Sequence, residues 1–589
     1  MKSDGKIINK LFLSSVISII AAAIAAMLGI VIDGIVISRF LGPDSMAAYG
    51  IVTPVVNMAT IFSGVLATGA QVVCAQRLGA GDAKGARRAF SMCMVITVAI
   101  SVILMSVIII FRENIVVFLG ARGDSAKLLP YASDYLLGMV FSLPSVIFLF
   151  EFNALMRLDG DANRVIVAVA VMTVLDVAGD LLNALVIKGG MFGMGMATTI
   201  SYFIALVIML LHFVKKDIIF KFSFKGLQLS DLRDIFVTGS ASAVGSGSAM
   251  LRNIVLNRIL VATALSSTAV GALGVLNTVY NFTSSTLVGV GMTCAMIAGM
   301  VLGEQDRTGA LHLVRVTFKT ALIIGTALAV ALFFSADLVA DVFKNENGVK
   351  MVELAARGLR FYAVSLILYG INNAFVNYTQ GLRRMGLSNI YCFLQNFVFI
   401  VIPALSLVGI LDTDAVWISF IIGEALTLTA IIVLAGVFKR GVPYRMKDFL
   451  FLKEPFGADE EDTFEVSITD KSQVNDVSRA VARFCETKSS DKKQRYLLSL
   501  FVEELGNNTA EYGFALGKNN SLDIRVVRIR DGWILRFRDN CRAFDPTEWI
   551  KLHESSDPAA NIGIRMVCGM AKSVNYLSTM NLNILTIRI

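Results

Sequence analysis

The sequence has few charged residues, few histidines and no paired cysteine motif. Only 17% of its 589 residues are charged, whereas a soluble domain carries about a quarter. The mean hydropathy of +0.69 agrees with this low charge and nearly excludes a wholly water-soluble protein. The seven cysteines form no C-x-x-C pair and there are three histidines, so neither zinc nor a disulfide framework is indicated.

Basic residues outnumber acidic ones, 53 to 45. In a soluble protein this excess would suggest a nucleic-acid partner. Here the basic residues gather in short loops between apolar stretches, which is the pattern of a membrane protein. We therefore predict the lipid bilayer as a partner and no nucleic acid.

Apolar stretches long enough to cross about 30 Å of hydrocarbon as helices occur up to about residue 440. The first lacks a sensible cleavage site and is too long for a signal peptide, so it is predicted to be a retained span. Twelve spans are predicted, at 8–32, 46–76, 90–111, 132–157, 163–187, 191–214, 236–262, 269–303, 314–335, 357–382, 388–410 and 414–438.

Alternate loops carry the positive charge. The basic residues are Lys2, Lys6 and Lys10 before the first span, and then Arg77, Lys84, Arg87, Arg88, Arg157, Arg164, Lys215, Lys216, Lys221, Lys225, Arg307, Arg383, Arg384, Lys439, Arg440, Arg445 and Lys447 after the even-numbered spans. The positive-inside rule and the even number of spans place both termini in the cytoplasm of a multi-pass plasma (inner) membrane protein.

An internal repeat divides the predicted spans into two sets of six, within residues 1–225 and 226–440. A shift of 224 residues superimposes Gly50 on Gly274, Val55 on Val279, Asn57 on Asn281, Leu78-Gly79 on Leu302-Gly303, Asp82 on Asp306 and Gly85-Ala86 on Gly309-Ala310. Two repeated halves are typical of a transporter, whose substrate binds between them. A channel or a purely structural membrane protein built by duplication is the alternative.

Acidic residues inside the predicted spans are candidates for function, because a charge near the bilayer midplane is costly. Asp33 lies within or at the outer end of the first span, and Asp176 and Asp180 share one face of the fifth. Buried carboxyls can exchange a proton or ligate sodium. Glu151 and Glu424 are weaker candidates, and a structural role as hydrogen-bonded neutral acids is the alternative for all five.

Several motifs resemble the MATE (multidrug and toxin extrusion) family of antiporters. They are VIDG at 31–34, FLG at 40–42, MAAYG at 46–50, QRLGAGD at 76–82, RLDGD at 157–161 and GMGMAT at 193–198. The resemblance covers residues 5–440. It implies two six-helix bundles around a central cavity, and export of amphipathic, often cationic compounds against inward H⁺ or Na⁺.

The same resemblance implies which acids couple transport to the ion. The family's aspartate in the first span falls on Asp33, and its Asn-x-x-x-Asp pair falls on Asp176 and Asp180. An aspartate at 176 in place of asparagine adds a second acid to this pair. The ion and its stoichiometry therefore remain open.

The composition changes beyond residue 440. Residues 441–462 are polar and acidic and are predicted to be a linker. Residues 463–589 are predicted to form a soluble α/β domain, with strands at 463–468, 522–529, 533–538 and 583–589 and helices at 472–487, 491–511 and 563–573.

This C-terminal domain resembles the histidine-kinase-like ATPases of the GHKL superfamily, in their anti-sigma-factor form, an α/β sandwich. The motifs are LFVEELGNNTAEYGF at 500–514, RDNCRAFDP at 538–546, a polar flexible stretch at 547–560 and NIGIR at 561–565. The resemblance implies ATP or ADP with Mg²⁺, bound by Asn508 (the Mg²⁺ ligand), Asp539 (the adenine acceptor) and Gly563 (beside the phosphates), with Glu504 as the catalytic base.

Two departures weaken this resemblance. Cys541 and Ala543 replace glycines that give the nucleotide room, and the second glycine-rich box retains only Gly563. No Walker loop is present, so the domain is not predicted to be a P-loop ATPase. A histidine kinase also lacks its phosphoacceptor, since His212 and His312 lie outside any cytoplasmic dimerisation helix and His553 lies in the predicted lid. Nucleotide binding is thus better supported than catalysis.

The sequence therefore predicts an ion-driven exporter of xenobiotic compounds with a cytoplasmic nucleotide-binding regulatory domain. Two alternatives remain. One is a membrane-anchored signalling protein whose C-terminal domain phosphorylates a serine or threonine of a cytoplasmic regulatory partner, as anti-sigma kinases do. The other is a flippase for a lipid or a lipid-linked sugar.

Overall fold

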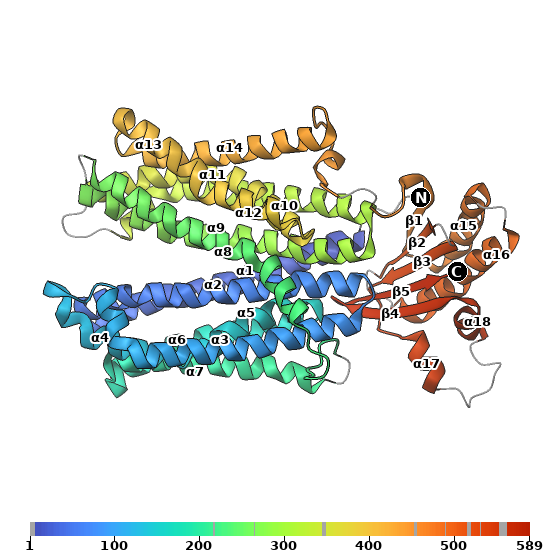
Figure 1. Ribbon diagram of the computed structural model, residues 1–589, viewed down its shortest axis with the longest axis horizontal. Helices are drawn as coiled ribbons and strands as arrows, with labels where there is room; N and C mark the ends of the chain where they lie inside the picture. Colours follow the sequence, from blue (N-terminus) through green and yellow to red (C-terminus); the bar gives the residue numbers. More distant parts are fainter. Residues whose placement is uncertain are drawn as a thin grey trace.

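The structure, a computed structural model, describes residues 6–215, 218–263, 266–343, 349–452, 456–488, 491–514, 520–529, 532–552 and 562–589. Long, roughly parallel helices form an elongated bundle, and a small domain containing a β-sheet covers one end of it (Figure 1). We call residues 456–589 the C-terminal domain, the bundle end that it covers the domain end, and the opposite end the far end.

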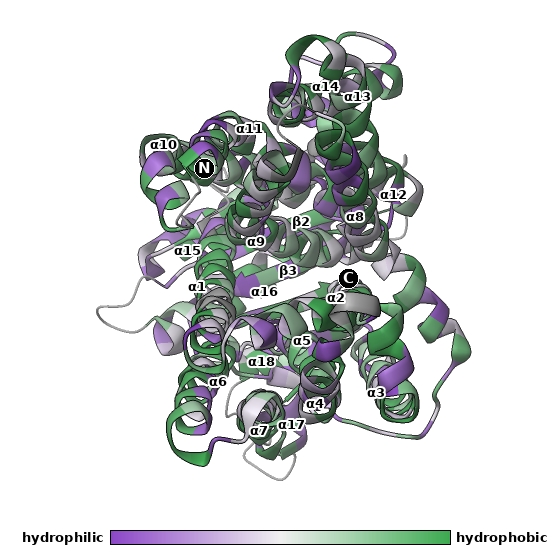
Figure 2. Ribbon diagram, turned by 90° about the vertical axis from the view of Figure 1, so that its left-hand side faces the viewer, coloured by the Kyte–Doolittle hydropathy of each residue, from purple (hydrophilic) through white to green (hydrophobic). Residues whose placement is uncertain are grey.

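The bundle consists of two halves. The first half contains α1 (Lys6–Val36), η1 (Ile37–Leu41), α2 (Pro43–Gly79), α3 (Ala83–Phe118), η2 (Gly123–Leu128), α4 (Leu129–Val140), α5 (Leu143–Leu158), α6 (Ala162–Leu182), η3 (Asn183–Ile187), α7 (Gly190–Leu210) and η4 (Leu211–Val214). The second half contains α8 (Leu229–Val261), α9 (Ser266–Glu304), α10 (Arg307–Asp341), α11 (Val349–Gly381), α12 (Met385–Phe393), η5 (Leu394–Val398), α13 (Phe399–Leu411) and α14 (Asp414–Lys439). Seen along the helices, hydrophobic residues predominate on the outer sides of both halves (Figure 2).

Within the described residues, ten helices are long and apolar enough to cross a membrane, and a bent helix pair makes an eleventh span. The bent pair corrects the continuous span predicted at 132–157. It breaks between α4 and α5 with an angle of 50°, because Pro144 stands at the start of α5 and a proline excludes the preceding residue from a helix interior.

The one predicted span that is not among these eleven is the seventh, 236–262, which falls on α8. This helix has 33 residues and lies alongside the others in the bundle (Figure 1), but serine, glycine and arginine make it too polar to pass as an apolar span. Three of its polar residues within this span, Thr238, Ser248 and Arg252, face the protein, since all three are buried.

The repeat found in the sequence recurs in the local structure. Asp82 caps α3 and Asp306 caps α10, and each carboxylate accepts a hydrogen bond from the backbone N–H three residues later, at 2.8 Å in both cases. These two residues are repeat mates, so the two halves begin their third helices in the same way.

The C-terminal domain contains a five-stranded antiparallel sheet of order β1-β2-β3-β5-β4. Its elements are η7 (Glu460–Asp462), β1 (Thr463–Ile468), η8 (Lys471–Gln473), α15 (Val474–Lys488), α16 (Lys492–Asn508), η9 (Thr509–Gly513), β2 (Leu522–Ile529), β3 (Gly532–Asp539), α17 (Pro546–Leu552), α18 (Ile562–Met570), β4 (Ser573–Thr579) and β5 (Leu582–Arg588). Strand β4 was not predicted, and α17 replaces the start of the predicted flexible stretch. The rest of that stretch, including His553, lies outside the described residues, as does Asn561 of the NIGIR motif.

The two faces of this sheet have different neighbours. One face packs against α15, α16 and α18 around a core that includes Val466, Phe501, Leu535 and Ile587. The other face lies against the domain end of the bundle (Figure 1), and Ile584 of that face belongs to the bundle's own core. The predicted linker is also tied to the bundle at its start, since the Tyr378 hydroxyl donates to the Leu450 carbonyl at 2.9 Å.

Candidate ion and nucleotide sites

The three predicted coupling acids lie together inside the first half. Asp33 on α1 is 9% exposed, and Asp176 and Asp180 on α6 are 5% and 1% exposed. The three carboxylates are close enough to interact electrostatically with one another. Spacing of four residues on α6 and packing of α1 against α6 bring them to one place.

Half of the six carboxylate oxygens are buried with no protein partner among the described residues. The Ser201 hydroxyl donates to Asp176 at 3.0 Å, but Asp33 Oδ1 and both oxygens of Asp180 are buried without a hydrogen bond among the described residues. Buried polar atoms are nearly always satisfied in folded proteins. This cluster can therefore hold a proton or a small cation.

Three tyrosines surround the acids and were missed in the sequence. Tyr49, Tyr135 and Tyr202 all interact electrostatically with the acid cluster, and the rings of Tyr49 and Tyr135 lie edge to face with centroids 5.5 Å apart. A polar residue in an otherwise apolar helix was the available signal, but tyrosine is also common at membrane interfaces.

A π-helical turn follows each acid-bearing helix. Helix α1 continues into η1 four residues after Asp33, and α6 continues into η3 three residues after Asp180. Such turns occur mostly as local bulges and often at functional sites. Their placement beside the acids marks this region as a place where the helices depart from regular geometry.

The two weaker candidates are buried within their own halves. Thr97 of α3 donates to Glu151 of α5. Glu424 of α14 accepts from the Asn372 amide at 2.7 Å and from the Gln395 amide at 3.0 Å. Side-chain donors thus satisfy both acids in part, which fits a structural role better than the bare oxygens of Asp180 do.

The halves are fastened together at the domain end. Asp231 of α8 is fully buried and accepts from Arg77 at 2.7 Å and from Arg88 at 2.6 Å, both of the first half. Arg383 of the second half bonds Gln76 of the first at 3.1 Å. These ion pairs and hydrogen bonds join the two halves and hold the bundle closed at the domain end.

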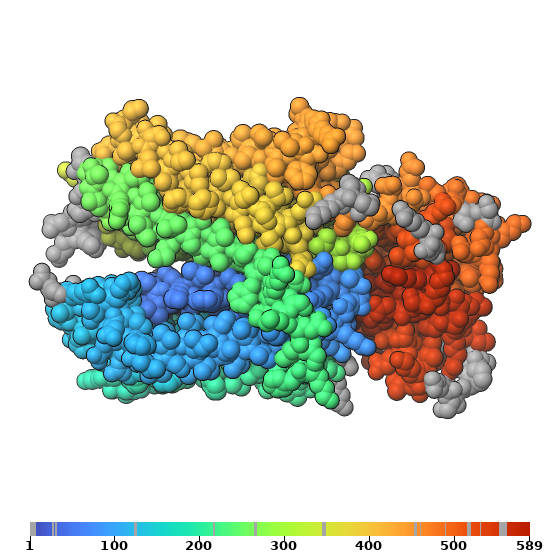
Figure 3. Space-filling view, viewed as in Figure 1, coloured from blue at the N-terminus to red at the C-terminus, as the bar shows by residue number. Residues whose placement is uncertain are grey.

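At the domain end, two glycines that are repeat mates allow the backbones of α2 and α9 to come into contact. A Cβ on Gly79 would lie 2.1 Å from the Met300 carbonyl oxygen, and one on Gly303 would lie 2.0 Å from that of Gln76. Helices α2 and α9 therefore cross in backbone contact. At the far end, by contrast, the surface is hollowed between the two halves on the face shown (Figure 3).

The predicted adenine acceptor, Asp539, is buried at the end of β3. Its Oδ1 accepts from the Asn583 amide at 2.8 Å and from the Cys541 backbone N–H at 2.9 Å. Burial raises the pKa of this carboxyl, although the two hydrogen bonds oppose the rise. Asn583 is held in turn by the Tyr576 hydroxyl, which donates to it at 2.8 Å.

Glu504 and Gly563 are also brought together. A Cβ on Gly563 would lie 2.1 Å from a Glu504 carboxylate oxygen, so only glycine admits this contact at the start of α18. Asn508 lies one turn after Glu504 on α16. Neither Glu504 nor Asn508 makes a side-chain hydrogen bond within the described residues, so both keep oxygens available for a cation.

The oxygen atoms of Glu504, Asn508 and Asp539 fit a nucleotide with Mg²⁺, but the chain around them leaves less room for it. The Cys541 side chain fills the place of the expected glycine and packs on Gly513, whose Cβ would lie 3.0 Å from the sulfur. The amide of Asn520 approaches the same sulfur at 3.5 Å. The cysteine therefore narrows this side of the site.

Two repeated halves of membrane-length helices, closed at one end and containing a buried acid cluster, define a multi-pass membrane transporter. The MatE family model matches residues 18–182 and 249–404, more than half of the chain. The chain therefore belongs to the MatE family. This confirms the predicted resemblance for the transporter part.

Known proteins of this kind are similar to the chain over most of their own length. "Multidrug export protein MepA" of Staphylococcus aureus (strain MRSA252) is 24% identical over 412 residues, which cover 68% of this chain and 88% of the relative. "Probable multidrug resistance protein YoeA" of Bacillus subtilis (strain 168) is 21% identical over 344 residues, 57% of this chain and 73% of the relative.

Solved structures share the fold. The "outward-facing conformation of a multidrug resistance MATE family transporter of the MOP superfamily" aligns with a TM-score of 0.68 and 21% identity, covering 72% of this chain and 94% of that chain. A MOP superfamily transporter from Pyrococcus furiosus aligns with a TM-score of 0.67 and 22% identity over the same shares.

Proposed function

We propose that this protein exports amphipathic or cationic compounds and is driven by an inward H⁺ or Na⁺ gradient. Family membership and the names of the multidrug relatives support export of small molecules. The observation that carries the ion coupling is the acid cluster of Asp33, Asp176 and Asp180, in which Asp33 Oδ1 and both oxygens of Asp180 are buried without a partner among the described residues. Such a cluster binds a proton or a cation in one state of the cycle and releases it in another.

The domain end is proposed to face the cytoplasm. The basic residues that follow the even-numbered predicted spans gather at this end, as the contacts of Arg77, Arg88 and Arg383 illustrate. The positive-inside rule then places the C-terminal domain in the cytoplasm and the hollowed far end outside.

The C-terminal domain is proposed to bind ATP or ADP with Mg²⁺ and to regulate transport without driving it. Asn508 would hold the cation, Asp539 the adenine amino group, and the α18 end at Gly563 the phosphates. The phosphates of a bound nucleotide would bring negative charge close to the Glu504 carboxylate, which lies against Gly563 in this structure. The kinase and flippase alternatives gain no support from the family or from the relatives' names.

Purified protein in proteoliposomes tests the proposal. We expect efflux of a cationic dye under an imposed H⁺ or Na⁺ gradient, with no requirement for nucleotide, because the chain has no Walker loop to power transport. Vesicles made leaky to ions should lose efflux even with ATP present. Efflux driven by ATP alone in leaky vesicles would contradict the proposed energy source.

Removing the C-terminal domain should preserve gradient-driven export. The cut belongs after Leu452, because Leu450 and Phe451 are buried against the bundle and the earlier part of the linker belongs to the transporter's fold. The shortened chain should transport at a changed rate, measured as initial dye efflux per inserted molecule. No efflux by a correctly inserted, monodisperse shortened chain would show that the domain is needed for the transport step itself.

A further inference from the structure

The sheet face that lies on the bundle is unusually charged for a buried surface. Arg525 of β2 bonds Asp306 at 2.7 Å, and both side chains are under 10% exposed. Arg536 of β3 bonds Glu304 at 3.1 Å, and Arg538 donates to the same carboxylate. Buried ion pairs contribute little net stability but fix geometry, because breaking one leaves an unpaired buried charge.

These acids belong to one half only. Glu304 ends α9 and Asp306 caps α10 in the second half, and the repeat mate of Glu304 is Ala80. Burial alone would raise the pKa of the Asp306 carboxyl, but the neighbouring Arg525 and Arg538 lower it more. The pKa therefore lies below its ordinary value, and the carboxyl is ionised. The second half therefore has an acidic anchor at Glu304 that the first half lacks, and Asp82, the repeat mate of Asp306, is exposed instead of buried.

The domain holds the first half through its β4–β5 hairpin. The Met580 backbone N–H donates to the Leu158 carbonyl at 3.0 Å, and the Thr579 hydroxyl donates to the same oxygen at 2.6 Å. The Asn575 amide also donates to the Gly81 carbonyl at 3.4 Å. All three contacts are with loops or helix ends of the first half.

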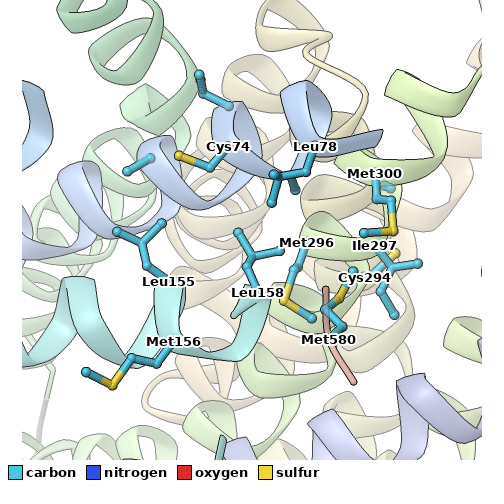
Figure 4. Close-up of a cluster of buried hydrophobic side chains, with 14 of the residues drawn as sticks. Cys74, Leu78, Leu155, Met156, Leu158, Cys294, Met296, Ile297, Met300 and Met580 are labelled. Atoms are coloured by element: carbon cyan, nitrogen blue, oxygen red, sulfur yellow. The ribbon is translucent and has the colours of Figure 1, made fainter. Parts of the chain in front are cut away.

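The tip of that hairpin enters the bundle. Met580 is 3% exposed and lies among Leu158 of the first half and Cys294 and Met296 of the second (Figure 4). Met580 and Asn581 have φ angles of 53° and 58°, which make the tight two-residue turn that lets the tip protrude. The Met580 side chain of the domain thus lies inside the bundle, in a core to which both halves contribute.

We propose that the C-terminal domain is a latch that holds the two halves of the transporter together at the domain end. It binds the second half through Glu304 and Asp306, the first half through Leu158 and Gly81, and both through Met580. The inference rests on the proposed export function, for which the two halves are expected to rock against each other and to separate at this end to receive substrate. Separation requires the domain to release one half, so the latch favours the state that is open at the far end.

Distance measurement across the domain end tests the latch. Spin labels on non-canonical amino acids at Lys84 of the first half and Gly386 of the second report how far the halves separate, and both positions are exposed. Three changes should each lengthen this distance: Glu304→Gln, Met580→Asp and truncation after Leu452. We expect the ratio of closed to separated molecules to fall about tenfold or more, since each substitution leaves an unpaired charge in the buried interface.

Glu486→Gln is the matched control. Glu486 pairs with Arg495 at 2.6 Å within the exposed helical side of the domain, so its loss should leave the distance unchanged. Unchanged distances in both substituted chains and in the truncated chain would overturn the latch, whatever the transport rate. Lengthened distances without any dye efflux would uphold the latch and refute the proposed function.

Discussion

Asp33→Asn is expected to reduce gradient-driven efflux to the rate of protein-free vesicles. Asparagine has the same shape but cannot take up or release a proton, and it offers a cation no charge. Asp33 Oδ1 is buried without a partner, so the substitution removes an uncompensated buried charge and should not destabilise the fold. Dye efflux from proteoliposomes and the thermal unfolding midpoint measure the two effects.

Asp134→Asn serves as the control for this prediction. Asp134 is an exposed acid on α4 of the same half, and its loss should leave efflux intact. Substrate binding by the Asp33 variant, followed by fluorescence polarisation, should also persist. Normal efflux by Asp33→Asn would remove this residue from the coupling site and leave Asp176 and Asp180 as the remaining acids of the cluster.

Asp539→Ala is expected to remove Mg²⁺-dependent nucleotide binding by the full chain. The adenine amino group would lose its charged acceptor, and the amide of Asn583 would lose its partner at 2.8 Å. A lost contact of this kind is worth about 1–3 kcal/mol, roughly one to two decades in affinity. Wild-type binding should itself be weak because of Cys541 and Ala543. Calorimetry with ATP and Mg²⁺ on the wild-type and variant proteins in nanodiscs measures the nucleotide affinity.

Asn508→Ala should behave differently from Asp539→Ala. It removes the proposed cation ligand, so nucleotide binding should persist but no longer depend on Mg²⁺. Asp476→Ala, at an exposed position of α15, should change nothing. No binding heat by the wild type at millimolar nucleotide would show that the domain is a docking module, and an unchanged affinity in Asp539→Ala would place the pocket elsewhere.

Much of the architecture could be predicted because the signals are local in the sequence. Long apolar runs reveal membrane helices by composition alone. Alternating apolar residues placed β1 at 463–468, where the structure has it. Strand β4 was missed because polar and apolar residues alternate only over its first four residues; Leu577 and Ser578 then reverse the order, so the strand lacks the sustained alternation on which such a prediction depends.

The acid cluster could be anticipated in part. The sequence shows Asp176 and Asp180 on one helical face, and the family resemblance points to Asp33. The sequence does not show that both carboxylate oxygens of Asp180 lack a partner among the described residues. It also does not show that Tyr202 of α7 lies near the cluster. Those facts depend on how α1, α6 and α7 pack, which no local pattern encodes.

The sequence by itself determined the membrane class, the twofold repeat, the acids in the first half and the boundaries of most strands, because composition and periodicity act over a few residues. Only the tertiary structure decided that Arg525 and Arg538 are buried, and Arg536 nearly buried, against Asp306 and Glu304. Alternating arginines on a strand read locally as a solvated face. They become an interface because loops more than two hundred residues away supply the matching charges, and a long-range pairing of that kind exists only once the chain has folded.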